Sequence, residues 1–456
     1  MAAEVPVPAV AIPICLARGQ DEQRGQAPPN SVAEPVPSAR IVNVALVNPF
    51  DPLPGDEVRQ GRYAALARAL VAAGHAVTWY SSDFSHTLKC PRDIRRIQVA
   101  GRTAGIVIEL IPTLPYPGNV CWARLRSHRK LAGEVRRRLE AAEPAPDVVV
   151  VSAPPPGLAA AVTDAAHRRS ARVILDVQDL WPETFARIWP RPLRWLNAVA
   201  GRPMASAMRH AENHADVGIG VAEEYRLHFE RHARPGTPSH VLHLGADLAE
   251  FDRYAEAPLP PVPPAAADKR WILVGGMLLG TALHWPFLLD LAAALGQRRS
   301  DAHVMIAGTG PMAESLRAAV AARKLDNVHL LGFQPYPAFC ALATRSDFGL
   351  NHCRADSFAY FPNRVFDYFA ADLPVINTVG GELADLLKAR QVGFTTTTFD
   401  AAAAAEYVAR TIATRPEVAN RPAPNARRAR WVTDFDRPAI ARRLVEIVEG
   451  QQFARP

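Results

Sequence analysis

The stretch DSFAYFPNRVFDYFAADLPVI, from Asp356 to Ile376, contains the signals of a loop, a helix and a strand in that order. Pro362 suits the first turn of a helix, where its missing N–H needs no partner, and apolar side chains then recur at helical spacing up to Ala370. Pro374 and a short β-branched run follow. The start of such a helix has free N–H groups and a partial positive charge, so the stretch predicts a phosphate-binding helix.

Arg364 and Asp367 lie three positions apart in this expected helix, so both side chains can point to one side of it. A guanidinium can bind phosphate, and a carboxylate can accept hydrogen bonds from the vicinal hydroxyls of a ribose. We therefore predict that Arg364 binds the phosphates of a nucleotide and that Asp367 binds its ribose.

This stretch resembles the donor-binding segment of retaining GT-B glycosyltransferases of family 4, especially bacterial O-antigen and capsule sugar transferases. In these enzymes a Pro-Ser-Lys triplet precedes a Glu-Tyr pair and a Gly-x-Pro-Val-Ile strand. The corresponding positions here are Pro362-Asn363-Arg364, Asp367-Tyr368 and Asp372-Leu373-Pro374-Val375-Ile376. The likeness extends over nearly the whole chain after about residue 40. It implies an α/β chain of two doubly wound Rossmann-like domains that face each other across a cleft.

Length and composition agree with two domains. The chain of 456 residues is too long for one ordinary core and fits two domains of roughly 200 residues each. No apolar run approaches the ~18 residues that a membrane helix requires. The five cysteines are odd in number and lack Cys-x-x-Cys spacing, which argues against a disulfide framework and a zinc site and favours a reducing cytoplasm.

Strand and helix signals alternate along most of the chain, which predicts parallel sheets wrapped by helices. Residues 1–40 are rich in Pro and Ala without periodicity and predict a disordered tail. We expect an acceptor-side domain over residues 41–255, a Pro-rich linker over 256–268 and a nucleotide-sugar-binding domain over 269–430. The last segment, residues 431–456, is expected to contain a helix that crosses back to the first domain, as the resemblance implies.

Two glycine loops are candidates for the donor side. Gly308 and Gly310 follow a predicted strand and open a helix, which fits either a close approach of phosphate or a purely structural turn. Relatives carry an Arg and a Lys after the first strand of the second domain, and these neutralise the donor diphosphate. The segment GGMLLGTALH, residues 275–284, has neither. We expect Gly276 and His284 to line the donor site there, and Arg364 to supply the charge.

Two strand ends of the first domain carry polar side chains. The segment WYSSDFSHTLK, residues 79–89, includes Asp83 and His86, although a satisfied surface histidine is an equal alternative. The segment VILDVQDLWPE, residues 173–183, resembles the Asp-x-x-Asp-Leu-Trp-Pro-Glu segment of the subfamily. We predict that Asp179 and His86, together with Arg364, are catalytic. The predicted acceptor-side residues are Gly61, Arg62, Asp83, Asp176, Trp181 and Glu183.

The formal net charge of +7 favours an anionic partner. The densest basic run lies at residues 122–139, in an expected helix, where a solvated face and peripheral attachment to an anionic membrane both fit. No nucleic-acid-binding motif accompanies it, so we expect no nucleic-acid partner. A metal-chelating Asp-x-Asp motif is not evident in a suitable place, so we expect neither a metal nor a cofactor in the reaction.

The sequence thus predicts a cytoplasmic glycosyltransferase, associated with the inner face of the membrane, that moves a sugar from a nucleoside diphosphate donor. The expected acceptor is a glycan or a lipid-linked precursor, and retention of configuration follows from the resemblance only. A non-catalytic GT-B protein that binds a nucleotide sugar or acts as a scaffold is the main alternative. It is favoured by Gly276 and by Ala359, where relatives have a cation and a glutamate. A sugar-nucleotide epimerase of similar fold is a third interpretation.

Overall fold

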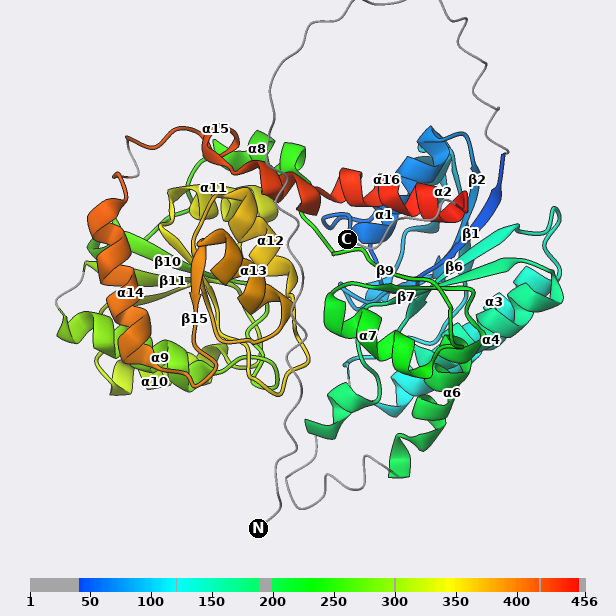
Figure 1. Cartoon of the computed structure of the whole chain (residues 1–456), viewed down its shortest axis with the longest axis horizontal. Coiled ribbons are helices and arrows are strands. Elements are labelled where there is room, and N and C mark those ends of the chain that lie inside the picture. Colours follow the sequence, from blue (N-terminus) through cyan, green and yellow to red (C-terminus); the bar gives the residue numbers. More distant parts are fainter. Residues whose placement is uncertain (1–40, 120, 188–198, 299–300, 418–419, 451–456) are drawn as a thin grey trace, which may run out of the picture. The chain divides into compact units, whose positions relative to one another are not determined.

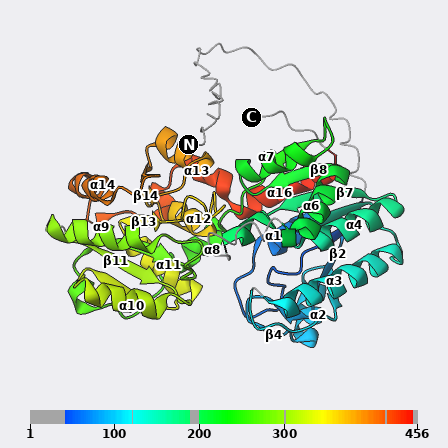
Figure 2. The same cartoon turned by 90° about the horizontal axis from the view of Figure 1, so that it is seen from below.

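The structure is a computed structural model that describes residues 41–119, 121–187, 199–298, 301–417 and 420–450 (Figure 1). The predicted tail, residues 1–40, and the first part of a helix predicted over residues 193–210 lie outside the described residues. The described residues contain two large parallel sheets, and helices lie on either side of the strands (Figure 2).

The first sheet has seven strands whose spatial order reverses once. From one edge to the other it contains β5 (Ile106–Ile111), β2 (Ala76–Ser82), β1 (Asn43–Val47), β6 (Val148–Ala153), β7 (Arg172–Val177), β8 (Val217–Gly220) and β9 (Ser239–Val241). All neighbours are parallel. Strand β6 is buried along its whole length, as expected for a strand covered on both faces. The order reverses between β1 and β6, where ligands of doubly wound sheets bind.

Helices and short elements complete this domain. They are α1 (Arg62–Ala72), the hairpin β3 (Phe84–Ser85) and β4 (Cys90–Pro91), α2 (Ile94–Thr103), α3 (Trp122–Glu140), α4 (Pro156–Arg168), the 3₁₀ helix η1 (Glu183–Arg187), α6 (Arg202–His214), α7 (Glu223–His232) and α8 (Leu248–Ala255). The helix signals of the sequence do not predict α2 or α8. Both begin at an aspartate whose side chain accepts the backbone N–H three residues on, Asp93 for α2 and Asp247 for α8.

The second sheet repeats the same topology with six strands. Its order is β12 (Val328–Gly332), β11 (Ala302–Ala307), β10 (Arg270–Gly275), β13 (Phe348–Asn351), β14 (Val375–Asn377) and β15 (Gly393–Thr395). Its helices are α9 (Trp285–Gln297), α10 (Ala313–Ala322), α11 (Tyr336–Arg345), α12 (Asn363–Ala370), α13 (Glu382–Arg390), α14 (Ala401–Thr414) and α15 (Pro424–Arg427). The order reverses between β10 and β13, so a ligand is expected at the loops that follow these two strands.

The C-terminal helix α16 (Arg437–Val448) follows the 3₁₀ helix η5 (Arg430–Phe435) and packs against α1 (Figure 1). Its Ile440 and Leu444 belong to the same buried cluster as Leu66 of α1. Arg172 at the start of β7 donates a hydrogen bond of 2.8 Å to the carbonyl of Ile447. The prediction of an α/β chain with two Rossmann-like sheets is confirmed.

Candidate active site

The loops that follow β10 and β11 pack against each other through glycine. Leu278 N–H donates to the carbonyl of Thr309 at 3.0 Å. A Cβ on Gly308 would lie 1.9 Å from the carbonyl oxygen of Gly276, and one on Gly310 would lie 2.7 Å from that of Leu278. Two backbones therefore meet where a side chain has no room. This packing explains both glycines structurally, and their contact with a donor stays a prediction.

Arg364 lies beside the loops that follow β10 and β11. It is the second residue of α12, whose N-cap is Pro362 and whose first residue, Asn363, is exposed. The guanidinium Nη2 is 3.9 Å from the position that a Cβ of Gly276 would occupy. Its Nη1 is enclosed and has no hydrogen-bond partner among the described residues. Because enclosed charged donors in proteins nearly always have a partner, this nitrogen indicates a place for an anion.

The titratable groups that Arg364 influences are uncharged at neutral pH. Burial, reinforced by Arg364, holds the pKa of His352 well below its ordinary value. Burial raises the pKa of Cys353 and that of Tyr368, the latter to about 12, although Arg364 acts in the opposite direction on both. The Tyr368 hydroxyl accepts the N–H of Gly275 at 3.0 Å. His352, Cys353 and Tyr368 therefore provide no negative charge to balance the positive charge of Arg364.

Asp367, one turn along α12, faces different partners. Its carboxylate accepts hydrogen bonds from the Tyr336 hydroxyl at 3.0 Å and from Arg59 Nη1 at 3.3 Å. The Arg59 guanidinium also lies 3.3 Å from the centre of the Tyr336 ring and pairs with Glu250 at 3.2 Å. A ribose at Asp367 would share the carboxylate with Arg59 or displace it. Sequence reasoning missed Arg59, because nothing local marks it as the partner of a residue in the other sheet.

His284 is used as a helix cap. Its Nδ1 accepts the N–H of Phe287 at 3.2 Å at the start of α9, and its ring stacks on Phe399 with centroids 3.8 Å apart. Burial and the neighbouring Arg354 lower its pKa, so it is uncharged at neutral pH. The expectation that His284 helps to hold a diphosphate therefore finds no positive charge to support it.

Asp179 is held within its own loop. One oxygen accepts the Leu180 N–H at 2.8 Å and the Thr184 hydroxyl at 2.9 Å, and the other accepts the indole N–H of Trp181 at 3.0 Å. Burial raises its pKa, although these three hydrogen bonds act in the opposite direction. In this structure the carboxylate fastens the turn between β7 and η1. Its predicted catalytic role stays a prediction.

Arg62 and Asp176 form a buried ion pair. Arg62 Nε and Nη2 each lie 3.2 Å from one oxygen of Asp176, and Arg62 Nη1 also donates to the carbonyls of Leu242 and His243. The two side chains are 3% and 1% exposed. Gly61 directly precedes α1, and a Cβ there would lie 2.8 Å from a neighbouring carboxylate oxygen. These three predicted acceptor-side residues thus join α1, β7 and the segment after β9.

Of the remaining predicted side chains, Asp83 and His86 have structural partners. Asp83 accepts both the N–H and the hydroxyl of Thr113 at 2.9 Å. His86 Nδ1 lies 2.8 Å from the Tyr116 hydroxyl. Burial, helped by nearby arginine and lysine, lowers the pKa of His86 to about 3, so it stays neutral under physiological conditions. Glu183 opens η1, and its Oε2 is enclosed without a hydrogen-bond partner among the described residues.

A cavity of about 650 Å³ lies beside Trp181. The Arg124 guanidinium is 4.7 Å from the Trp181 ring centre, and the His128 ring stacks on the same indole with centroids 6.0 Å apart. Both side chains are buried. The cavity lining is mainly apolar and includes Leu125, Leu158, Phe185, Pro203 and Met204.

Arg124 and His128 correct one interpretation of the basic helix. The basic run at residues 122–139 predicts charges that are all solvated or lipid-facing. Arg124 and His128 instead share the inward face of α3 with Leu131 and Val135, at spacings of four and three residues. The exposed cations near this end of the helix are Arg126, Arg129 and Lys130, and Trp122 is 78% exposed.

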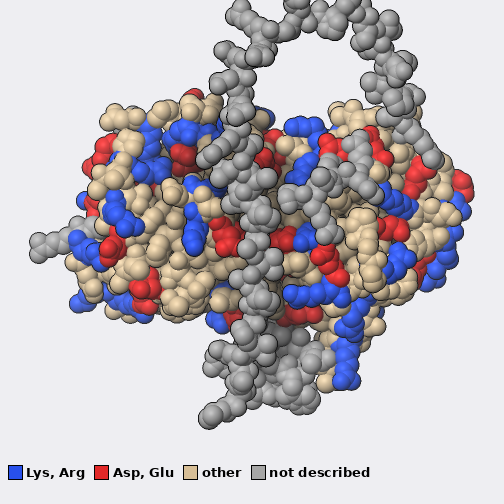
Figure 3. Space-filling model, viewed as in Figure 1, with Lys and Arg blue, Asp and Glu red and all other residues tan. Residues whose placement is uncertain are grey.

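Charge is mixed over the surface. On the face drawn in Figure 3, Lys and Arg alternate with Asp and Glu over the coloured residues, so the net charge of +7 does not form one basic surface there. Within the described part of the chain, no helix combines the length and apolarity needed to cross a membrane.

Two family models match the chain. Residues 62–250 match the model described as "Glycosyltransferase Family 4", and residues 269–414 match the model described as "Glycosyl transferases group 1". The first range covers most of the seven-stranded sheet, and the second covers the six-stranded sheet with Arg364 and Asp367. No curated protein sequence matches.

Solved structures share this architecture. HepE of Anabaena in complex with UDP has a TM-score of 0.59 at 13% identity, covering 90% of this chain and 100% of that chain. Sucrose-phosphate synthase of Thermosynechococcus elongatus has a TM-score of 0.62 at 15% identity, covering 90% and 98%. WaaG, a glycosyltransferase involved in lipopolysaccharide biosynthesis, has a TM-score of 0.55 at 16% identity, covering 89% and 100%. At these identities the likeness concerns the fold, which is GT-B.

Proposed function

Because this chain belongs to the glycosyltransferases of group 1 and family 4, which transfer a sugar from a nucleotide sugar, we propose that Arg364 binds the diphosphate of its donor. The observation that carries the proposal is the enclosed Nη1 of Arg364, which has no hydrogen-bond partner among the described residues. The guanidinium lies at the end of β10, near the reversal of strand order, where a nucleotide would bind in a sheet of this kind.

The proposed chemistry follows from the charge that develops when the sugar leaves. The departing diphosphate gains negative charge, and a fixed cation in an enclosed site stabilises that charge. The start of α12 adds a partial positive charge of about half a unit. Arg364 therefore takes the place of the Arg and Lys that relatives carry after the first strand of this domain. Asp367 would bind the ribose, and neither a metal nor a cofactor is part of the proposal. Retention of configuration is proposed from the family resemblance.

For the acceptor we propose a lipid-linked precursor. The cavity beside Trp181 has an apolar lining suited to a lipid chain, and Arg124 in its wall offers a cation for a phosphate on the same molecule. The exposed Trp122, with Arg126 and Lys130 on the same helix, suits peripheral contact with an anionic membrane. A polysaccharide acceptor would need hydrogen-bonding groups, and the lining has few of them.

Donor binding and turnover test the assignment of Arg364. Arg364→Ala should lower turnover by roughly 10²–10³-fold. Arg364→Lys should recover part of the loss, because it keeps the charge but not the bidentate fork. The matched control is Arg317→Ala on α10, whose exposed side chain pairs with its helical neighbour Glu314. His284→Ala should have a smaller effect at neutral pH.

Calorimetry should separate the phosphate contribution from that of the base. Arg364→Ala should weaken the binding of a nucleoside diphosphate and leave that of the free nucleoside unchanged. Wild-type turnover in Arg364→Ala would refute the assignment. Nucleotide binding by the wild type without turnover on any common donor would favour the non-catalytic alternative.

The acceptor proposal needs a separate variant. Met204→Glu places a charge in the cavity lining and should abolish transfer to a lipid-linked acceptor while leaving nucleoside diphosphate affinity unchanged. Leu259→Glu, at an exposed apolar position, is the control. Unchanged transfer by Met204→Glu would exclude this cavity as the lipid site.

A further inference from the structure

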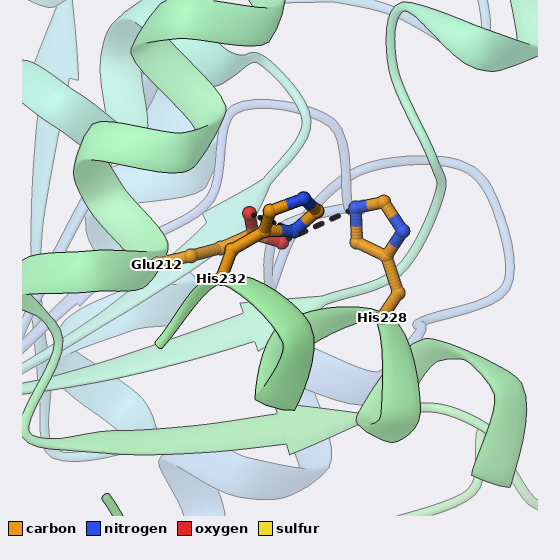
Figure 4. Close-up of side chains that lie close together, drawn as sticks. All are labelled: Glu212, His228 and His232. Atoms are coloured by element: carbon orange, nitrogen blue, oxygen red, sulfur yellow. Dashed lines mark ion pairs between the residues drawn. The ribbon is translucent and has the colours of Figure 1, made fainter. Parts of the chain in front are cut away.

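A buried carboxylate lies against two imidazoles on the side of the first domain formed by α6 and α7. Glu212 on α6 is fully buried, and His228 and His232 lie one turn apart on α7. Figure 4 shows both rings directed at the carboxylate. His232 Nδ1 is 3.1 Å from Oε2 of Glu212, and His228 Nε2 is 3.4 Å from Oε1.

The polar groups of this cluster are not satisfied by hydrogen bonds. Neither carboxylate oxygen of Glu212 has a hydrogen-bond partner among the described residues, and neither has Nδ1 of His232. The short distances therefore do not correspond to hydrogen-bond geometry. A buried carboxylate without a hydrogen-bond donor is costly, so its two oxygens and His232 Nδ1, together in this state, indicate a missing ligand in the cluster.

We propose that Glu212, His228 and His232 bind a divalent transition-metal ion of the zinc type. One ligand atom from each residue lies within 4.8 Å of the other two. In a tetrahedral zinc site with bonds of about 2.0–2.2 Å, neighbouring ligand atoms are about 3.3 Å apart. His232 Nδ1 lies 3.1 Å from one oxygen of Glu212 and His228 Nε2 lies 3.4 Å from the other, so each imidazole nitrogen is at about this spacing from a carboxylate oxygen. Two histidines four residues apart on one helix face the same way, as in other zinc-binding helices.

The ligand chemistry selects among metals. Two imidazole nitrogens and one carboxylate oxygen suit zinc, cobalt or nickel, whereas magnesium and calcium prefer oxygen ligands. Three protein ligands leave a fourth position for water. Glu183 is a further carboxylate beside this cluster, because its charge acts on Glu212. Its own Oε2 is enclosed and has no hydrogen-bond partner among the described residues. A metal here would link α6 and α7 next to the loop that contains Trp181.

Metal titration of the full chain, purified without a histidine tag and stripped with a chelator, tests the site. Cobalt(II) should bind one equivalent and give the visible absorption of a tetrahedral site, and zinc should displace it. Glu212→Gln keeps the size of the side chain, and His232→Ala removes a partly exposed one, so at least one variant should fold. Each should weaken cobalt binding by at least tenfold. His210→Ala, on the same helix but paired with the exposed Asp164, should leave it unchanged.

Two results would overturn the proposal. One is no cobalt or zinc binding by the folded wild type at micromolar concentrations, which would leave Glu212 packed against the two histidines without a metal. The other is wild-type binding and absorption in both Glu212→Gln and His232→Ala. The readout does not depend on sugar transfer, so it stands whether or not the proposed donor site is correct.

Discussion

Replacing Asp176 with alanine should destabilise the first domain by about 3–5 kcal/mol, the cost expected when a buried ion pair loses one partner. Arg62 would keep only two backbone carbonyls as acceptors while its guanidinium stays 3% exposed. For comparison, Arg168→Ala breaks a pair with Glu140 whose side chains are 50% and 34% exposed, and should cost less than about 1 kcal/mol.

Urea unfolding, followed by tryptophan fluorescence, measures this difference as a lower midpoint at an unchanged slope. The double variant Arg62→Met/Asp176→Leu removes both charges at once and should be more stable than Asp176→Ala, because Arg62 is no longer a buried cation that has lost its carboxylate partner. A wild-type midpoint in Asp176→Ala together with lost turnover would refute the reasoning. That result would return Asp176 to the acceptor-side role that its sequence context predicts.

Gly308→Ala should weaken nucleoside diphosphate binding at least tenfold, because its Cβ would meet a carbonyl oxygen at 1.9 Å, whereas Gly133→Ala, with open space around it, should not. Burial lowers the pKa of His128 to about 3. As the pH falls below about 6.5, His128 is protonated in the unfolded chain but stays neutral in the folded one, so the unfolded state is favoured. This difference at His128 alone should lower the free energy of unfolding by about 2 kcal/mol at pH 5. That part of the pH dependence should be absent from urea melts of His128→Asn. Asp367→Ala should raise the Kd of a nucleoside diphosphate about 10–100-fold, and Tyr336→Phe should not. Equal calorimetric affinities of wild type and Asp367→Ala would remove the ribose assignment.

The glycine loops show how far local pattern reasoning reaches. A glycine after a strand predicts a tight turn, and the structure contains a bend at Gly310 and a turn at residues 311–312. The same pattern cannot tell whether the free space serves a phosphate or a second backbone. Here the second backbone, at Gly276, fills it. The distinction depends on how two loops from different strands pack, which no local spacing encodes.

Asp179 and His86 show the same limit for polar side chains. Asp179 follows β7, as the apolar run before it predicts, whereas His86 follows the short strand β3 and not β2. Their hydrogen-bond partners, Thr184 for one and Tyr116 for the other, decide whether the side chain is available for chemistry. The local sequence around a carboxylate in a loop is the same whether its side chain stabilises a turn or contacts a sugar.

The alternation of apolar strands and helices by itself determined two parallel sheets, because strands covered on both faces must be apolar along their length. It also determined the helix that carries Arg364, through Pro362 and helical spacing. Only the tertiary structure decided which charges meet. Arg59 and Asp367 are 308 positions apart, and Glu212 meets His228 and His232 from another helix. Such contacts depend on the packing of whole elements, and the free energy of that packing is spread over many residues with no local signature.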